Sequence, residues 1–253
     1  GPGVETVRTG QRIAYLPSTP GTYASHGIAR LEALYPVPDA VDDATAAAVL
    51  LKGLTAWMLV ERCAKIQPGD SVLVHAAAGG VGSLLVQWLK AVGATVFAHA
   101  GNDAKAAAAK KLGADYVFSC PLEALADAVR ERNSGAGVAC VLDGVGQASW
   151  DASLASLAKR GLMVSYGNAS GPVPPVAPLE LLRRGSLFLT RPSLYDYLDT
   201  PEARATAGER LFGMVRSGAV KVEIGQRFAL ADAAEAHRAL EARKTTGSTI
   251  LIP

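Results

Sequence analysis

The segment Asp70-Ser-Val-Leu-Val-His-Ala-Ala-Ala-Gly-Gly-Val-Gly82 is the most informative part of the sequence for the fold class. Its apolar first half predicts a buried strand, and the residues after the glycines have the spacing of an amphipathic helix. Ala77-x-Gly79-x-x-Gly82 therefore matches the glycine fingerprint of dinucleotide-binding units, with alanine at the first position. Gly79 would let the backbone approach a pyrophosphate, and Gly82 would let the helix pack closely on the strand. This context favours nucleotide binding over the alternative, a structural glycine turn.

From Ser71 onward, segments with strand and helix patterns alternate. We expect strands near 71–75, 94–98, 115–118, 138–142, 161–166 and 186–190, and helices near 81–92, 103–112, 121–132, 148–158 and 201–217. This order predicts an α/β fold with a doubly wound parallel sheet and helices on both faces. The proline-rich segment 171–178 is expected to be an extended loop over the sheet.

The two ends of the sequence look different from its middle. Segment 1–45 contains strand fragments interrupted by prolines, and segment 219–253 has the pattern of a strand, a helix and a second strand. The expected ranges are 220–229, 231–242 and 247–252. We expect the two ends to pack together as a second domain, interrupted by the nucleotide-binding domain at 46–218.

Composition places the chain among ordinary globular proteins. It has 253 residues, of which 49% are hydrophobic and 19% charged, with a net charge of +2. This balance gives no electrostatic argument for nucleic acid or an anionic membrane as partner, and neither a signal peptide nor a membrane-spanning apolar run is visible. Cys63, Cys120 and Cys140 are scattered, so no disulfide framework or zinc site is expected. Free thiols fit a reducing, cytoplasmic location.

Five segments together carry a family resemblance. They are Leu51–Ala56, His75–Gly82, Arg160–Gly171, Gly185–Pro192 and Thr246–Pro253. In this order and spacing, the sequence resembles the NADPH:quinone oxidoreductases, the zinc-free, zeta-crystallin-like branch of the medium-chain dehydrogenase/reductase superfamily. The resemblance covers essentially the whole chain.

The resemblance implies a Rossmann domain that binds NADPH, a β-rich GroES-like catalytic domain, and hydride transfer to a quinone without a metal. It also implies a homodimer formed through the edge strand of the Rossmann sheet, here 186–190. Family members begin with several strands that this sequence lacks, including an asparagine-tyrosine motif at the nicotinamide pocket. We therefore expect a partial GroES-like domain, made of 1–45 and 219–253.

The residues after the second strand bear on the choice of cofactor. NAD-binding units place an acid about twenty positions after the glycines, and the strand end here carries none. Lys105 lies where the family places a lysine for the 2′-phosphate, and this role is favoured over the alternative of a solvated surface lysine. NADPH is therefore favoured. Asn102 or Asp103 could cap the next helix, and Asp103 facing the ribose would instead favour NADH.

The resemblance also implies a set of cofactor contacts. The set is Thr55, Ala78, Gly79, Gly80, Val81, Gly101, Asn102, Lys105, Gly144, Tyr166, Gly167, Asn168, Leu189, Arg191 and Arg243. Alternatives remain for several members: Thr55 could bond its own helix backbone, Asn168 could serve a turn, and the two arginines could be rim charges. Two positions depart from the family pattern, since Cys120 stands where a tyrosine is usual and Gly144 where a serine is usual.

No residue is expected to act as a catalytic acid or metal ligand. His75 ends a buried strand and is expected to be packed and hydrogen-bonded, Asp143 is expected to shape a turn, and the other histidines share no ligand spacing. A quinone is electrophilic, so a cofactor held close in an apolar slot would suffice. The alternatives are an enone or alkenal double-bond reductase, and a non-catalytic NADPH-binding protein with a structural or regulatory role.

Overall fold

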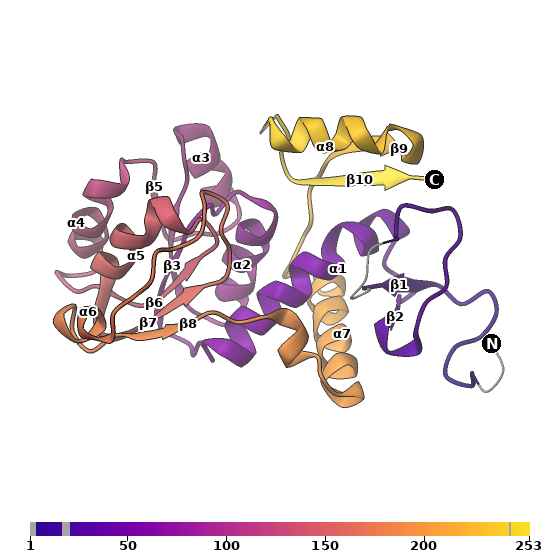
Figure 1. Cartoon of the computed structure of the whole chain (residues 1–253), viewed down its shortest axis with the longest axis horizontal. Helices are drawn as coiled ribbons and strands as arrows, with labels where there is room; N and C mark the ends of the chain where they lie inside the picture. Colours follow the sequence, from indigo (N-terminus) through magenta and orange to yellow (C-terminus); the bar gives the residue numbers. More distant parts are fainter. Residues whose placement is uncertain (1–3, 17–20, 243) are drawn as a thin grey trace. The chain divides into compact units, whose positions relative to one another are not determined.

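The structure is a computed structural model that describes residues 4–16, 21–242 and 244–253 (Figure 1). The chain divides into two units. One is a continuous stretch, 55–197, and the other combines the described residues of 1–54 and 198–253.

The continuous unit is built on a six-stranded sheet in which all neighbouring strands run parallel. Its strands are β3 (Ser71–Val74), β4 (Thr95–His99), β5 (Tyr116–Phe118), β6 (Val138–Asp143), β7 (Leu157–Ser165) and β8 (Phe188–Thr190). Their order is β5-β4-β3-β6-β7-β8, so the chain starts in the middle and winds outward in both directions. This is the Rossmann arrangement, and it confirms the expected α/β fold.

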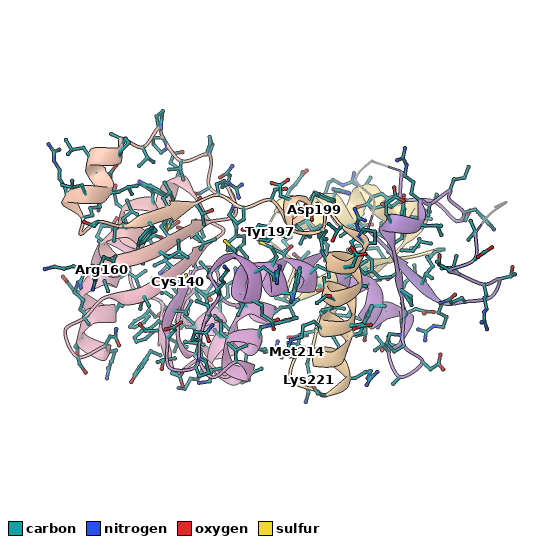
Figure 2. The ribbon with its side chains drawn as sticks, turned by 90° about the horizontal axis from the view of Figure 1, so that it is seen from below. Cys140, Arg160, Tyr197, Asp199, Met214 and Lys221 are labelled. Carbon is teal, nitrogen blue, oxygen red and sulfur yellow. The ribbon has the colours of Figure 1, made fainter. Side chains whose placement is uncertain are left out.

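Five helices connect these strands. They are α2 (Gly80–Ala91), α3 (Asp103–Lys111), α4 (Leu122–Arg132), α5 (Trp150–Ser156) and α6 (Pro178–Arg183). Right-handed crossovers place α2 and α3 on one face of the sheet and α5, with α4 packed against it, on the other (Figure 1). The central strands β3, β4 and β6 are almost entirely buried, which explains their largely apolar sequences, whereas the outer strands β5 and β8 are partly exposed. Figure 2 shows buried Cys140 within this sheet and exposed Arg160 at the outer end of the same unit.

The elements expected after Ser71 are present, but one helix is shorter than expected and one short helix, α6, was not expected. The helix expected at 148–158 is shorter, because β7 already begins at Leu157 and makes an irregular turn in which Arg160 has a φ of 61°. The segment 171–178 is extended as expected up to Pro178, which begins α6. Val173 and Val176 pack against the core cluster around Leu73 and Phe97.

One long helix was not predicted. It is α1 (Asp43–Trp57), continued by a π-helical segment, Met58–Cys63. Asp42 precedes it and accepts hydrogen bonds from the Thr45 amide and hydroxyl, so the helix start is well defined. By length and composition alone Asp43–Cys63 could cross a membrane, but 61% of its most apolar window is buried in the protein. It is a core helix and not a membrane span.

The other unit contains two small sheets. β1 (Ile13–Tyr15) pairs antiparallel with β2 (Leu34–Pro36), and β9 (Ile224–Ala229) pairs parallel with β10 (Ser248–Ile252). Its further helices are α7 (Pro201–Arg216) and α8 (Ala233–Glu241). These described residues by themselves do not identify a GroES-like domain.

Short 3-10 turns complete the described elements. They are Leu31–Ala33, Gln147–Ser149, Leu194–Tyr197 and Leu230–Asp232.

Candidate functional site

The glycine loop between β3 and α2 is tightly folded. Ala76 has a φ of 50°, and the Gly79 amide donates to its carbonyl oxygen at 2.8 Å. A Cβ added to Gly82 would lie 2.2 Å from that same oxygen, so only glycine fits there. α2 begins at Gly80, and its first-turn N–H groups lack partners within the helix. The loop therefore presents backbone donors and the positive end of a helix dipole to a ligand.

The loop sits at the point where the strand order reverses. The Ala77 amide donates to the His99 carbonyl at the end of β4, and the His75 amide donates to the Leu142 carbonyl of β6. β4 and β6 flank β3 on opposite sides and start the two windings of the sheet. In open α/β sheets the crevice at this switch point is where ligands bind.

The loop after β4 leads into α3. Asn102 Oδ1 accepts the Lys105 amide at 2.9 Å, which makes Asn102 the N-cap of the helix. Asp103 accepts a hydrogen bond from the Ser119 hydroxyl. Gly101 and the side chain of Lys105 are exposed, so the lysine is open to a ligand in the first turn of α3.

The loops after β6 and β7 are joined along their backbones. The Tyr166 amide donates to Asp143 O at 2.8 Å, and the Ser170 amide donates to Val145 O at 2.8 Å. The Tyr166 ring lies so close to Gly144 that a Cβ there would be 2.8 Å from two ring carbons. Burial, with Asp143 nearby, raises the pKa of Tyr166 above its ordinary value, so the phenol stays neutral.

Behind these loops lies a buried polar cluster. Asp143 is fully buried and accepts hydrogen bonds from two backbone amides and from the hydroxyls of Ser149 and Ser153. The Ser153 hydroxyl oxygen also lies 2.9 Å from Nε2 of His75, which is itself fully buried. The pKa of His75 is lowered to about 4, mainly by burial; nearby Asp143 opposes this shift, and His99 contributes to it. These contacts match the expected roles of His75 and Asp143.

The structure brings most predicted contacts to one edge of the sheet. The glycine loop, the loop at 101–105 and the paired loops at 144 and 166–168 all follow the carboxyl ends of strands. Leu189 lies on edge strand β8 and Arg191 just after it, both exposed. Thr55 lies on α1, outside the sheet. Arg243 lies outside the described residues.

The roles of Ser149 and Ser153 were not predicted. Both are buried and donate hydrogen bonds to Asp143, Ser149 from the 3-10 turn before α5 and Ser153 from α5 itself. Their four-residue spacing is the one available signal, because residues four apart share a helix face.

Within the part of the chain that the structure describes, no group of three or more His, Cys, Asp or Glu residues could hold a metal ion. The three cysteines are free thiols. Burial raises the pKa of Cys63, although Tyr197 and Thr190 hydrogen bonds oppose the shift.

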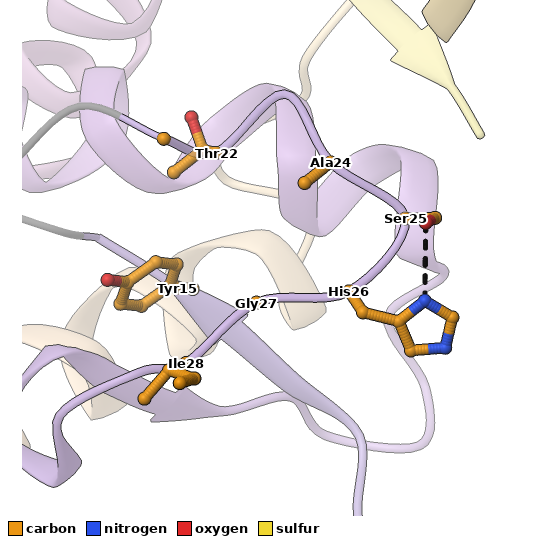
Figure 3. A pocket seen from close by; sticks show the side chains of 8 residues that line it. Tyr15, Thr22, Ala24, Ser25, His26, Gly27 and Ile28 are labelled. Carbon is orange, nitrogen blue, oxygen red and sulfur yellow. Dashed lines mark hydrogen bonds between the residues drawn. The ribbon is translucent and has the colours of Figure 1, made fainter.

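Two hollows occur in the other unit, away from the glycine loop in sequence. The smaller, about 220 Å³, is lined by Tyr15 and the 21–28 loop, where the His26 ring turns toward Ser25 and away from Tyr15 (Figure 3). The larger, about 920 Å³, is an apolar groove between β2 and α7. Neither gathers groups suited to catalysis.

The strand order and the glycine loop define a dinucleotide-binding α/β protein. Residues 80–202 match a family described as zinc-binding dehydrogenase. The chain is 44% identical to quinone oxidoreductase from Salmonella typhimurium, a match covering 100% of this chain and 78% of that protein. It is also 37% identical to 2-haloacrylate reductase from Burkholderia sp., covering 100% and 77%.

The crystal structure of Escherichia coli quinone oxidoreductase complexed with NADPH matches with a TM-score of 0.95 and 42% identity, covering 100% of this chain and 78% of that one. The chain therefore belongs to the quinone oxidoreductase family of the medium-chain dehydrogenase/reductase superfamily. This confirms the resemblance found in the sequence.

Proposed function

We propose that the chain binds NADPH at the carboxyl edge of its six-stranded sheet and reduces a quinone with it. The observation that carries the proposal is the glycine loop at the switch point, where Gly82 lets the start of α2 pack directly on the Ala76 carbonyl. The loop suits a pyrophosphate because it offers several amide donors and no bulky side chain. The solved relative that binds NADPH with the same fold supports the choice of cofactor.

The adenosine end of the cofactor would be held by two loops. Backbone amides of Ala78, Gly79, Gly80 and Val81 would bind the pyrophosphate. Lys105 would pair with the 2′-phosphate, and Gly101 and Asn102 would line the ribose. The N-cap bond from Lys105 N–H to Asn102 fixes the backbone from which this lysine extends, which supports the assignment.

The nicotinamide end would lie against the loops after β6, β7 and β8. We assign contacts there to Gly144, Tyr166, Gly167 and Asn168, followed by Leu189 and Arg191, with Thr55 and Arg243 as further contacts. The bound cofactor supplies the hydride. The residues of the chain orient the ring and exclude water, and no side chain is assigned as an acid.

We assign 46–218 as the Rossmann domain and 1–45 with 219–253 as part of a GroES-like catalytic domain. The support is that the segments on both sides of 55–197 contribute to one unit; the limits of that unit differ from the assigned ranges, since it includes α7. We also assign homodimer formation to the edge strand within 186–190, since Phe188 is 62% exposed there.

Reduction of an activated carbon–carbon double bond is the second candidate. It is favoured by the similarity to a 2-haloacrylate reductase, whose name indicates an α,β-unsaturated substrate. Both reactions need a hydride delivered to an electrophilic carbon or oxygen in an apolar slot. A panel of quinones, enones and haloacrylates with NADPH as donor would separate the two, and binding without turnover of any acceptor would favour a non-catalytic role.

The test of cofactor binding is Lys105→Ala. Removing the cation should raise the Kd for NADPH about tenfold or more and change the Kd for NADH less than about twofold, because only NADPH has the 2′-phosphate. Lys111→Ala is the matched control, since this exposed lysine lies at the other end of α3. Titration by calorimetry gives both constants, and equal losses for the two cofactors would contradict the phosphate assignment.

A further inference from the structure

The buried cluster contains a hydrogen-bond chain whose directions can be deduced. Asp143 Oδ1 accepts the amides of Val145 at 2.7 Å and Gly146 at 3.2 Å. Its Oδ2 accepts the hydroxyls of Ser149 at 2.7 Å and Ser153 at 2.6 Å. Each acceptor oxygen thus meets two donors, which offsets the loss of water around a buried carboxylate.

These directions fix the protonation of His75. A serine hydroxyl has one proton, and Ser153 donates it to Asp143. Ser153 Oγ, 2.9 Å from His75 Nε2, must therefore accept, so the imidazole proton is on Nε2. Nδ1 is left with a lone pair, and this agrees with its being buried without a hydrogen-bond partner among the described residues.

The chain of bonds links two loops of the candidate site. His75 is the first residue after β3 and opens the glycine loop. Asp143 ends β6 and holds the amides of the loop that follows. Ser153, on α5, bonds to both. All three side chains are buried, so their influence on a ligand would pass through the loops that they hold.

We propose that Asp143, Ser153 and His75 are positioning residues that keep these two loops in register for the dinucleotide, and that Asp143 sets the tautomer of His75 through Ser153. The effect on cofactor affinity rests on the proposed function. The tautomer of His75 and the rigidity of the two loops are properties of the free chain and can be measured without cofactor.

Asp143→Asn should reverse the chain of bonds. The backbone amides can only donate, so the new amide oxygen stays beside Val145 and Gly146, and the new NH2 group faces Ser149 and Ser153. Ser153 then accepts from that group and donates to His75 Nε2. The imidazole proton moves to Nδ1.

Nitrogen-15 NMR of the imidazole groups distinguishes the two tautomers. The chain has four histidines, so the signals that disappear in His75→Gln identify His75. At neutral pH and without cofactor we expect the Nε2–H tautomer in the wild type and the Nδ1–H tautomer in Asp143→Asn. An Nδ1–H tautomer in the wild type, or the same tautomer in both proteins, would overturn the proposal.

The coupling of the loops is tested by Ser153→Ala against Ser156→Ala. Ser156 is equally buried on α5, but its hydroxyl bonds the Ala152 carbonyl of its own helix. In Ser153→Ala alone, hydrogen exchange at the amides of Ala77, Val145 and Gly146 should quicken about tenfold, and the Kd for NADPH should rise about tenfold. Equal behaviour of the two variants would refute the coupling.

The outcomes for the proposal and for the proposed function are separable. A wild-type chain that does not bind NADPH would contradict the proposed function, while the tautomer and exchange measurements would still decide on the positioning role. If Ser153→Ala does not fold, the tautomer measurement on Asp143→Asn still decides on the proposal, because that variant keeps the size of the side chain.

Discussion

The imidazole of His75 makes stability depend on pH. Burial lowers its pKa from 6.5 to about 4, and the groups that face it are Asp143, Ser153 and His99. Between these two pH values the unfolded chain binds a proton that the folded chain does not. The contribution of neutral His75 to the free energy of unfolding is complete above pH 6.5 and is lost as the pH falls toward 4. About 2 kcal/mol of unfolding free energy is lost between pH 7 and pH 5.

Urea unfolding of the wild type and His75→Gln at these two pH values checks this expectation. The wild type should lose about 2 kcal/mol more unfolding free energy than the variant on going from pH 7 to pH 5. His26→Gln is the control, because this histidine is exposed, and it should behave as the wild type. Equal pH dependence of the wild type and His75→Gln would show that His75 does not cause the effect.

Gly144 packs directly against the ring of Tyr166. A Cβ there would lie 2.8 Å from two Tyr166 ring carbons and 2.9 Å from the hydroxyl oxygen. The tyrosine ring fills the space that a serine at 144 would need, so the two residues form a matched pair.

Gly144→Ser should therefore lower the free energy of unfolding by about 1–3 kcal/mol through overpacking. Gly101→Ser is the matched control, since nothing lies within 4 Å of its added Cβ. In a Tyr166→Ala background the cost of Gly144→Ser should shrink, because the obstructing ring is gone. A double-mutant cycle measured by urea unfolding tests the pair, and simple additivity would contradict it.

Two helical glycines differ in the space around them, so their replacement by alanine should change stability in opposite directions. Gly82 in α2 packs on backbone, with its added Cβ 2.2 Å from Ala76 O, whereas Gly213 in α7 has open space around it. Gly82→Ala should cost at least about 2 kcal/mol of unfolding free energy. Gly213→Ala should instead stabilise the protein by about 0.5–1 kcal/mol, since alanine favours the helix. Thermal unfolding gives the sign of the stability change for both variants. A Gly82→Ala variant as stable as the wild type would contradict the close packing.

The alternating elements of the sheet could be predicted because each signal is local. Apolar runs between glycine turns mark β3, β4 and β6, and amphipathic spacing marks α2. α1 escaped prediction because much of its surface is buried and it lacks a wide polar face. The limits of β7 depended on the irregular turn at Arg160, which no short pattern specifies.

The candidate site could be predicted only where backbone dictates residue type. Gly79 and Gly82 indicate the position of the glycine loop, because few other residues fit such a turn. The cluster of Asp143, Ser153 and His75 joins residues distant in sequence, and its partners are defined only once β3, β6 and α5 are packed. Polar side chains of this kind look like ordinary turn or helix residues in the sequence.

At the scale of the whole molecule, edge strand β8 leads to a prediction about assembly. Phe188 is 62% exposed and Leu189 37%, on a strand with a free edge. If β8 forms the homodimer contact, Phe188→Lys should shift the protein from dimer to monomer in light scattering. Leu240→Lys, at an exposed leucine on α8, should leave the dimer intact. A monomeric wild type, or equal masses for the two variants, would contradict the assignment.

The division of the chain into one continuous and one interrupted unit sets an order of events on the ribosome. The stretch 55–197 contains every strand of the six-stranded sheet, so this unit can fold as soon as it has emerged. Residues 1–54 are made before this stretch, but their own unit is complete only after 198–253 has been made. At ordinary rates of translation that last segment takes about 3–11 s to synthesise. During this interval Tyr35 of β2 and Gly53 of α1 lack the α7 residues Gly208 and Leu211 against which they pack in the complete unit.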